Sequence, residues 1–459
     1  MYLTLLLDAE DLVDPRSDDV ALRVAQILAE EGTPATFGVV GEKARLWERR
    51  GRQDIIRTLE PFDISLHTNF HSVHPTVAEY LEGMGWEDGV AEVVAREGPG
   101  VRDVQRIFGR MPSCWGRGGS SWGPQVAPAL RQMGVPAEML SLTHLKSPLH
   151  SMHRFCGTLS YYPCYYGGFY AAFSDDAAFA VAWAKASQYI SDRAKEGVDW
   201  LGLYVCSPEM MRAKTWWDGP NFDRGVNAPP GQWRLPDYRS DAEWEVAQRN
   251  LRRLVTDAAR LPGVQLRTVG EVNALAIDSP SLIQVSDLSA RARTAAASQE
   301  IEAADSLLSP AETIYLWGLW LSAGRPGGAL PYRYVEGPVE ESCPSGAAET
   351  VSAEQIQQAA CALCQAVERS GRLPASLDLG QGELAIGTVY HAFADACAGD
   401  PGGAVRLRPG AQVPGIGQTL GEEVATEVPG WLHKPDLDVT GIATYTRLQS
   451  WTLKPVVLH

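Results

Sequence analysis

Short apolar runs alternate with amphipathic stretches along the first 205 residues of the chain. In the amphipathic stretches apolar residues return every three or four positions, as in residues 20–28 and 126–133, and this spacing predicts helices. The short apolar runs predict buried strands at Tyr2–Leu7, Ala35–Val40, Phe62–Leu66, Met139–Leu142 and Trp200–Val205. Strands separated by helices in this order predict βαβ units and a parallel sheet.

The pattern changes after residue 278. Ser279–Ser289 has the composition of a linker, and residues 400–459 read as loops with short strand-like runs. Helical runs lie between them at Ala292–Leu308, Pro310–Ser322, 352–369 and Ile386–Ala398. We therefore predict an α/β domain over residues 1–278. A smaller, mostly helical domain over residues 279–459 would serve in binding or oligomerisation.

Charge and composition exclude several classes of protein. The 459 residues carry 40 Lys+Arg against 56 Asp+Glu, a net charge of −16, with no basic block, so the chain is not a strong nucleic-acid binder. No apolar stretch approaches the roughly 20 residues that a membrane-spanning helix needs. The start, MYLTLLLDAED, lacks the features of a signal peptide, which predicts a cytoplasmic protein. We expect a small-molecule or glycan substrate, no membrane or nucleic-acid partner, and a homo-oligomer as a further option.

Acidic residues and histidines follow two of the predicted strands. Asp8, Glu10 and Asp11 come after the first strand, and His67 and His71 follow the third. In α/β barrels the carboxyl ends of the strands share one face, so these side chains are expected to meet there. Two imidazoles four residues apart can share one ion if the chain between them makes a helical turn. With a carboxylate as third ligand, such a site suits hydrolysis. The alternative is a chance HxxxH on loop or surface histidines.

The order of these motifs resembles the polysaccharide deacetylase superfamily, the nodulation-factor deacetylase homology domain of carbohydrate esterase family four. The resemblance rests on LLLDAED, TPATFGVVG, DISLHTNFH and CWGRGG, and it covers roughly residues 1–275. It implies a distorted (β/α)7-type barrel. It also implies a metal-dependent hydrolase that removes an acyl group, such as acetyl, from an N-acylated or O-acylated sugar-like substrate.

The resemblance assigns roles to the residues that match its motifs. Asp8 would be the catalytic base, while Glu10, His67 and His71 would bind one divalent ion, with Asp11 as the fallback ligand. Zinc is the first choice for two imidazoles and a carboxylate, and cobalt, manganese, nickel and iron are alternatives.

The two remaining family motifs are matched less closely. The loop WGRGG resembles the family's arginine loop, which implies that Arg117 is a catalytic residue that orients Asp8 and keeps it ionised. Where the family has a general-acid histidine, this chain has Ser207, in LYVCSPEM. A serine hydroxyl cannot replace an imidazolium as an acid near neutral pH. The substitutes considered are His153, His150, His144, Cys206 and Glu209.

Residues beside these motifs are candidates for substrate contact. We expect Trp115, Trp122 and Ser207 to contact the substrate, although aromatic residues in such loops often only pack. His74 is close enough in sequence to be a further ligand or to support one. The aromatic segment from Trp216 to Trp233 reads either as a pocket wall or as a packed loop.

Two alternatives concern the whole protein. Residues Ser352–Ala398 resemble the pseudomurein-binding repeat, which implies glycan contact, whereas a helical domain that caps the barrel or forms an oligomer fits the same residues. Ser207 motivates a second hypothesis for the function. In it, the barrel is catalytically impaired and acts as a glycan-binding, metabolite-binding or scaffolding protein.

Overall fold

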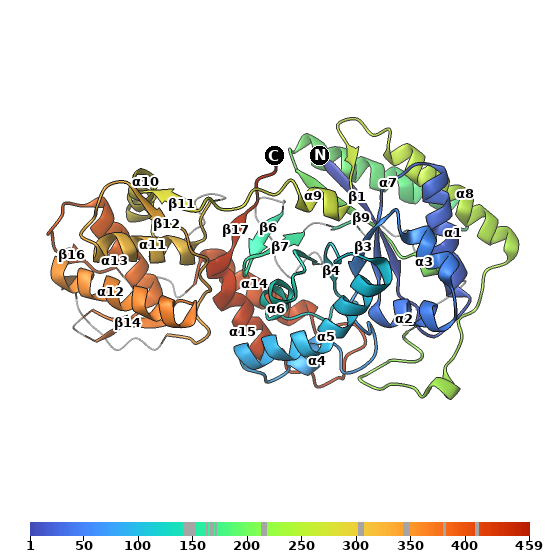
Figure 1. The fold of residues 1–459 in the computed structure, drawn as a ribbon, viewed down its shortest axis with the longest axis horizontal. Helices are drawn as coiled ribbons and strands as arrows, with labels where there is room; N and C mark the ends of the chain where they lie inside the picture. Colours follow the sequence, from blue (N-terminus) through green and yellow to red (C-terminus); the bar gives the residue numbers. More distant parts are fainter. Residues whose placement is uncertain are drawn as a thin grey trace.

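The structure, a computed structural model, describes residues 1–140, 152–161, 164–165, 169, 172–212, 218–301, 307–342, 349–379, 382–408 and 413–459. These residues form two bodies that lie next to each other (Figure 1). We call residues 1–278 and 413–459 the first body and residues 280–408 the second body. The first body holds a large sheet surrounded by helices, and the second body is mostly helical. No helix in the described part of the chain is long and apolar enough to cross a membrane.

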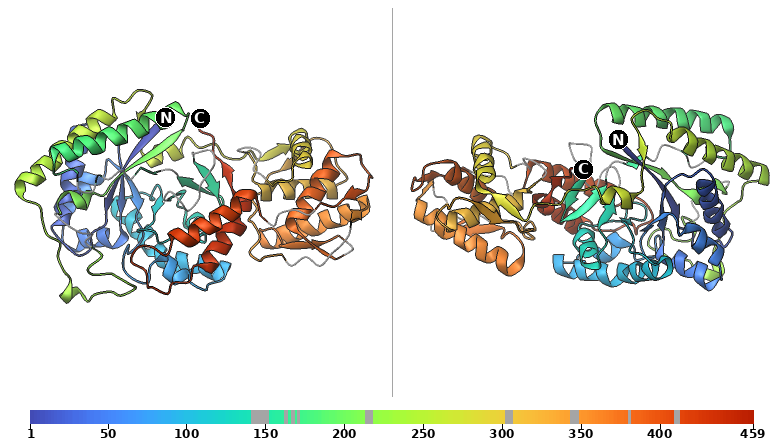
Figure 2. Two further views of the ribbon diagram at one scale, coloured as in Figure 1. Left: turned by 180° about the vertical axis from the view of Figure 1, so that it is seen from behind. Right: turned by 45° about the horizontal axis from the view of Figure 1, so that its top comes forward.

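One sheet of eleven strands organises the described part of the first body. Its strands are β1 (Tyr2–Ala9), β2 (Thr36–Val39), β3 (Asp63–Leu66), β4 (Trp115–Gly116), β5 (Ala137–Met139), β6 (His153–Phe155), β7 (Thr158–Tyr161), β8 (Cys164–Tyr165), β9 (Trp200–Val205), β10 (Gln265–Leu266) and β17 (Lys454–Pro455). They follow the order β17-β6-β7-β5-β4-β3-β2-β1-β9-β8, with β10 also paired to β1. The end strands β8 and β17 do not pair with each other within the described residues, so the sheet curls into an open, distorted barrel (Figure 2).

The strands from β7 to β8 in this order run parallel, whereas β6 is antiparallel to both of its neighbours. β1 is central and buried along almost its whole length, which explains its nearly continuous apolar sequence. The helices that surround the sheet are α1 (Ser17–Glu30), α2 (Gly41–Arg49), α3 (Gln53–Leu59), α4 (Val77–Leu81), α5 (Trp86–Phe108), α6 (Val126–Met133), α7 (Asp176–Lys195), α8 (Asp241–Ala258) and α9 (Val269–Asn273), with short 3-10 turns η1 (Ser207–Met210) and η2 (Pro230–Gln232). This arrangement confirms the predicted distorted barrel.

The second body has a hydrophobic core of its own. Its helices are α10 (Val285–Ala297), α11 (Pro310–Ser322), α12 (Ala353–Ser370) and α13 (Ile386–Ala398). Almost every residue of α11 is buried, because the other helices and the end of the chain enclose it. Three small antiparallel pairs complete the body: β11 (Leu282–Gln284) with β12 (Ala329–Pro331), β13 (Thr350–Val351) with β16 (Val405–Arg406), and β14 (Ser376–Asp378) with β15 (Glu383–Ala385).

The end of the chain returns to the first body. α14 (Gly415–Glu427), α15 (Thr440–Gln449) and the 3-10 turn η3 (Ser450–Thr452) are followed by β17, which joins the large sheet beside β6. α14 and α15, drawn in red in Figure 1, pack with each other and with the core of the first body. The prediction of a loop-rich end was therefore wrong, because the apolar residues of these two helices are sparse and become buried only by tertiary packing.

The predicted domain division at residue 278 remains a prediction. The packing shows in addition how the chain passes between the two bodies. The chain passes from the first body to the second body after α9, and it returns to the first body at α14. The residues predicted as a linker, Ser279–Ser289, include β11 and the first turn of α10. The second body is thus inserted in the chain between two parts of the first body.

Candidate metal centre

β1 presents two carboxylates on the same side of the chain. Asp8 lies near the end of β1 and Glu10 follows directly after it, and alternate residues of an extended chain point the same way. Asp8 pairs in register with Gly38 of β2, where a Cβ atom would lie 2.6 Å from Asp8 Oδ1. The glycine therefore leaves the space that the Asp8 carboxylate occupies.

Two histidines reach the same place from the loop after β3. His67 follows β3 directly, and the imidazole rings of His67 and His71 have centroids 4.8 Å apart. The chain between them makes no helical turn: Thr68 and His71 have φ angles of 56° and 52°. A helical turn is therefore not what brings the two imidazoles together: two residues in the left-handed region, which is uncommon for side-chain-bearing residues, turn the chain instead. The predicted meeting of the two imidazoles is nevertheless what the structure shows.

Glu10, His67 and His71 converge on one point. Glu10 Oε2 lies 3.2 Å from Nε2 of His67 and 3.2 Å from Nε2 of His71. One ligand atom of each residue lies within 4.8 Å of the other two, and all three residues are buried. Burial opposes ionisation of Glu10, but the two neighbouring imidazoles hold the pKa of its carboxyl well below its usual range. Two imidazole nitrogens and a carboxylate oxygen are a donor set that fits a divalent ion such as zinc.

A hydrogen-bonded pair behind His71 orients its ring. His71 Nδ1 lies 2.6 Å from the Ser72 hydroxyl, which donates to Asp218 Oδ2 at 2.5 Å. If Nδ1 carries the proton that it gives to Ser72, Nε2 is left free to bind a metal, which is the usual support for metal-binding histidines. Burial raises the pKa of the Asp218 carboxyl, and the nearby His71 opposes the rise.

Asp8 lies beside the three ligands without being one of them. Its Oδ2 is 3.4 Å from His67 Nε2 and, among the described residues, accepts no hydrogen bond. Burial raises the pKa of Asp8 to about 6, although the charge on His67 and a hydrogen bond from the Tyr204 side chain both act to lower it. A buried carboxylate next to the ligands, with a pKa close to neutral, can take a proton from a nearby water.

Arg117 does not hold Asp8 as the sequence suggested. Within the described residues the two side chains form no hydrogen bond or ion pair, and Arg117 Nε is buried without a partner. Asp8 is bordered instead by His67 and by Tyr204 of β9. Burial lowers the pKa of His67, but Asp8 and Glu10 raise it above its usual value despite the charge of Arg117. Arg117 is thus near the centre without positioning the base.

Asp11 and Ser207 form hydrogen bonds that hold the neighbouring backbone in place. The Asp11 carboxylate pairs with Arg212 and accepts the backbone N–H groups of Val13 and Asp14, so it does not turn to the ligands. Ser207 is buried, and its hydroxyl donates to the backbone carbonyl of Asp8. This bond ties η1 to the end of β1, and a substrate contact by Ser207 stays a prediction.

Trp115 and Trp122 lie in the packed interior, and both are 0 % exposed. The indole N–H of Trp115 donates to Glu97 at 2.9 Å, and that of Trp122 donates to Glu138 at 3.1 Å. With no surface open to solvent, neither ring lines the site in this arrangement. The expectation that they contact the substrate was drawn from loop position alone, and the structure does not support it.

The candidates for the missing acid fall in different places. His144 and His150 lie outside the described residues, and His153 sits on β6, which β7, β5 and β4 separate from β3 along the sheet. The Cys206 thiol donates to Glu10 Oε1 at 3.1 Å, and burial raises its pKa well above its usual range.

Glu209 and His74 are the last two residues considered near the candidate centre. Burial raises the pKa of Glu209 to about 7, against the effect of Arg212, whose guanidinium lies 3.2 Å from Glu209 Oε1. His74 pairs with Glu79 at 2.6 Å and is not one of the three converging residues. Glu209 is therefore the substitute whose protonation suits an acid near neutral pH.

The end of the chain also reaches the candidate centre. The Trp431 ring meets the His71 ring edge to face, with centroids 5.5 Å apart. A Cβ atom on Gly119 would lie 2.1 Å from the Trp431 ring, so Trp431 fills the space that this glycine leaves. The Ser120 hydroxyl holds the segment by donating to the carbonyl of Gly430 at 2.9 Å.

Sequence reasoning missed Ser72, Tyr204, Asp218 and Trp431. Ser72 follows a predicted ligand, Tyr204 ends a predicted strand, and Asp218 stands in the aromatic segment that had been noted, so each carried a weak signal. Trp216 and Trp217 of that segment lie outside the described residues. For Trp431 we find no sequence signal, because its proximity to His71 arises only from the return of the chain.

Comparisons with known proteins give only distant similarities. No protein-family model matches the chain, and no curated protein matches it. Several solved structures resemble it at low TM-scores. Three of them are Puue allantoinase (TM-score 0.39, 11% identity, 60% of this chain and 89% of that one), a probable polysaccharide deacetylase from Pseudomonas aeruginosa PAO1 (0.39, 10%, 60% and 89%) and the peptidoglycan deacetylase PdaC from Bacillus subtilis (0.28, 11%, 59% and 88%). The chemistry of this chain therefore has to be argued from its own geometry.

Proposed function

We propose that the protein is a metal-dependent hydrolase that removes an acyl group from an N-acylated or O-acylated substrate, with a sugar-like compound as the first candidate. The observation that carries the proposal is the convergence of Glu10, His67 and His71 within 4.8 Å, with Asp8 beside them. Zinc is the first choice of ion for these donors.

The four residues divide the chemistry between them. Glu10, His67 and His71 would hold a divalent ion, which when bound polarises an acyl carbonyl and makes a neighbouring water more acidic. Asp8 takes the proton of the attacking water on Oδ2, the oxygen that has no hydrogen-bond partner in the described structure. The Tyr204 hydrogen bond and the bond from Ser207 to the Asp8 backbone keep Asp8 in place.

The leaving group needs a proton from a second residue. Glu209 is our choice, because it is buried, lies just after β9, and has a pKa raised to about 7 by that burial. General acid–base help of this kind contributes about 10²–10⁴-fold to a rate. The Glu209→Gln variant is therefore expected to keep its metal and lose activity by about that factor.

Metal binding is the first test. Zinc content after dialysis should be high in the unaltered protein and close to zero in His67→Ala. His391→Ala is the matched control, because His391 is a buried histidine in the second body, far along the chain from the three ligands. Unaltered protein that takes up no divalent ion, or His67→Ala that takes up as much as the control, would contradict the proposal.

Activity is the second test, with 4-nitrophenyl acetate and acetylated amino sugars as substrates. Asp8→Asn should retain zinc and lose about 10²–10⁴-fold in rate, since only the base is removed. A protein that binds zinc but releases no acetate from any of these compounds, even with Ser207→His, would instead favour the binding or scaffolding role.

A further inference from the structure

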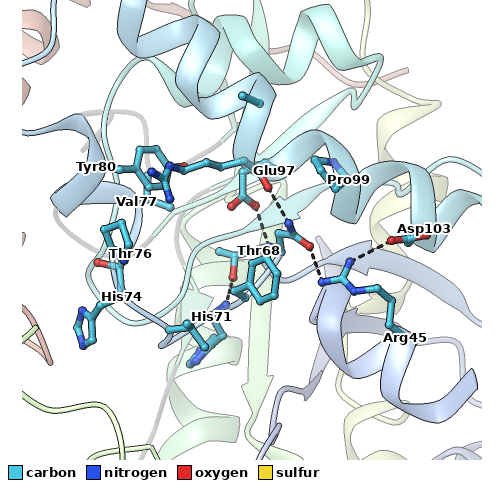
Figure 3. A pocket seen from close by; sticks show the side chains of 16 residues that line it. Arg45, Thr68, His71, His74, Thr76, Val77, Tyr80, Glu97, Pro99 and Asp103 are labelled. Carbon is cyan, nitrogen blue, oxygen red and sulfur yellow. Dashed lines mark hydrogen bonds and ion pairs between the residues drawn. The ribbon is translucent and has the colours of Figure 1, made fainter. Parts of the chain in front are cut away.

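A cavity of about 580 Å³ borders the loop that carries the proposed ligand His71. It lies between residues 68–77 and α5. Figure 3 shows its walls, with His71 and Thr68 from the loop, and Glu97 and Pro99 from α5. Apolar side chains of Val73, Pro75 and Val77 form much of the loop side. A cavity of this size with apolar walls and a few polar groups is typical of a small-molecule site.

Glu97 is the polar group that distinguishes this cavity. It is 4 % exposed, and its Oε2 accepts the backbone N–H of Asn69 and the indole N–H of Trp115, both at 2.9 Å. Its other oxygen, Oε1, has no hydrogen-bond partner among the described residues, and in Figure 3 it is turned toward the side of the cavity where Tyr80 and Val77 lie. The Tyr80 hydroxyl is likewise buried without a partner in that part of the chain.

Glu97 also lacks an ion-pair partner, unlike the other charged groups around the cavity. Arg45 pairs with Glu42 at 2.6 Å and with Asp103 at 3.0 Å, and Arg96 pairs with Glu92 at 2.5 Å. His74 pairs with Glu79. Among the described lining residues, Glu97 is therefore the charge-capable group that has no opposite charge in contact, and buried charges are normally paired.

The sequence of α5 breaks helix rules at this cavity. Residues 97–100 read Glu-Gly-Pro-Gly inside a helix of 23 residues, although proline and glycine both disfavour a helix interior. Pro99 has no N–H to donate to the carbonyl of Ala95 four residues earlier, and both residues line the cavity. Local rules are broken most often at functional sites.

We propose that this cavity binds the ammonium group of a small primary amine, whose apolar part lies against Val73, Pro75 and Val77. Glu97 Oε1 is an acceptor without a donor among the described residues, and an ammonium group brings donors together with the missing positive charge. The ligand class is thus a compact amine, as distinct from an alcohol or a carboxylate of the same shape.

Binding at this cavity should act on the metal centre, a consequence that rests on the proposed function. Glu97 Oε2 holds the N–H of Asn69, which lies between the ligands His67 and His71. An amine that shifts Glu97 therefore shifts the loop, and the amine and zinc must change each other's affinity by the same factor.

The test is isothermal titration of the whole protein, without added metal, with cyclohexylamine and with cyclohexanol at pH 7.5. We expect the amine to bind about 10- to 100-fold more tightly than the alcohol, as a charge-assisted hydrogen bond would provide. In Glu97→Gln, which keeps an acceptor for Asn69 and Trp115, the two probes should bind equally. Ala95→Phe should weaken both probes by filling the cavity from an exposed position on α5.

Glu92→Gln is the matched control, because it removes an acidic charge from the same helix without touching Glu97. The preference for the amine should survive in it. Equal binding of both probes by the unaltered protein, no binding at millimolar concentration, or an amine preference that persists in Glu97→Gln would each overturn the proposal. None of these measurements requires hydrolysis. The amine-binding result can therefore be interpreted even if the protein has no hydrolase activity.

A second titration measures zinc binding with and without cyclohexylamine. A change in zinc affinity that disappears in Glu97→Gln supports the coupling. An unchanged zinc affinity in the presence of saturating amine overturns the coupling, whereas absence of any zinc binding would point to failure of the proposed metal centre itself.

Discussion

The candidate centre of the first body and two helix starts of the second body treat their polar groups differently. Near the ends of β1 and β3, Asp8 Oδ2 has no hydrogen-bond partner within the described residues, and Thr68 and His71 hold left-handed backbone angles. In the second body, Ser309 and Glu312 form a capping box at the start of α11, and Ser352 and Gln355 form one at the start of α12.

The difference indicates where selection for chemistry has overridden the local preferences for relaxed backbone angles and paired polar groups. A capped helix with an apolar core follows the rules that favour folding, whereas strained backbone and unpartnered buried carboxylates are retained mainly at sites that act on a ligand. The comparison therefore predicts that changes in the second body alter stability without altering metal binding, and that changes near His71 do the reverse.

The largest effect is expected where the two bodies are joined. Lys454 of β17 is buried against Glu312 at 2.8 Å, and it also donates to the Ser279 hydroxyl. Lys454→Met should destabilise the protein by about 3–5 kcal/mol, because it leaves the Glu312 charge buried and unpaired. Thermal and urea denaturation measure this loss. A double variant, Lys454→Met with Glu312→Gln, removes the unpaired charge and keeps an acceptor for the cap of α11 and for Tyr332, so it should recover part of the loss. A failure to do so would mean that packing, not charge, dominates here.

A matched pair of serine variants tests the comparison directly. Ser72→Ala should weaken zinc binding by about 10- to 100-fold, since it removes the support of His71, with little change in stability. Ser309→Ala should cost about 0.5–2 kcal/mol of stability through the lost helix cap, with zinc binding unchanged. Zinc titrations and urea denaturation of both variants give the four values. If the two variants changed zinc affinity and stability in the same way, the proposed difference between the two regions would be wrong.

A pH effect of about 2–3 kcal/mol is expected from Glu138. This residue is 0 % exposed and accepts hydrogen bonds from Trp122 and Ser160, and burial raises its pKa to about 7. Because the folded protein holds the proton more tightly than the unfolded chain, this contribution is complete below the unfolded pKa near 4.5 and is lost as the pH rises through about 7. Urea midpoints from pH 5 to pH 8 should fall less in Glu138→Gln than in the unaltered protein. Parallel curves would contradict this assignment.

The smallest effect is expected from Trp431. Trp431→Ala removes the ring beside His71, while the three ligands stay in place. Zinc content should be unchanged, and KM for 4-nitrophenyl acetate should change by no more than about tenfold, the equivalent of 1.4 kcal/mol. A loss of zinc in this variant would instead make Trp431 part of the support of His71.

Much of the parallel sheet could be predicted because its strands are buried on both faces. Such strands read as short apolar runs, and β1, β2, β3 and β9 all lie within or close to the predicted ranges. β5 lies slightly before its predicted run, at Ala137–Met139. α14 and α15 were missed because their burial depends on contacts with distant parts of the chain, a dependence that periodicity does not record.

The ligands of the candidate centre could be predicted because D-x-E after a strand and HxxxH after another are local patterns. The environment of Asp8 could not, since Tyr204 approaches from β9 and Arg117 forms no hydrogen bond or ion pair with Asp8 within the described residues. Trp431 was out of reach for the same reason: its neighbours His71 and Gly119 belong to distant parts of the chain.

Both ends of the chain lie together at the start of β1, where the Met1 amino group donates to the Gly263 carbonyl and Leu458 bridges to Ala276 (Figure 2). The candidate centre lies at the other end of this strand, about 20 Å away. A tag or fused protein attached to either terminus would therefore emerge at the end of β1 that lies away from the candidate centre. The same adjacency would allow the two ends to be joined and new ones opened elsewhere, which makes this chain a practical scaffold for circular permutation.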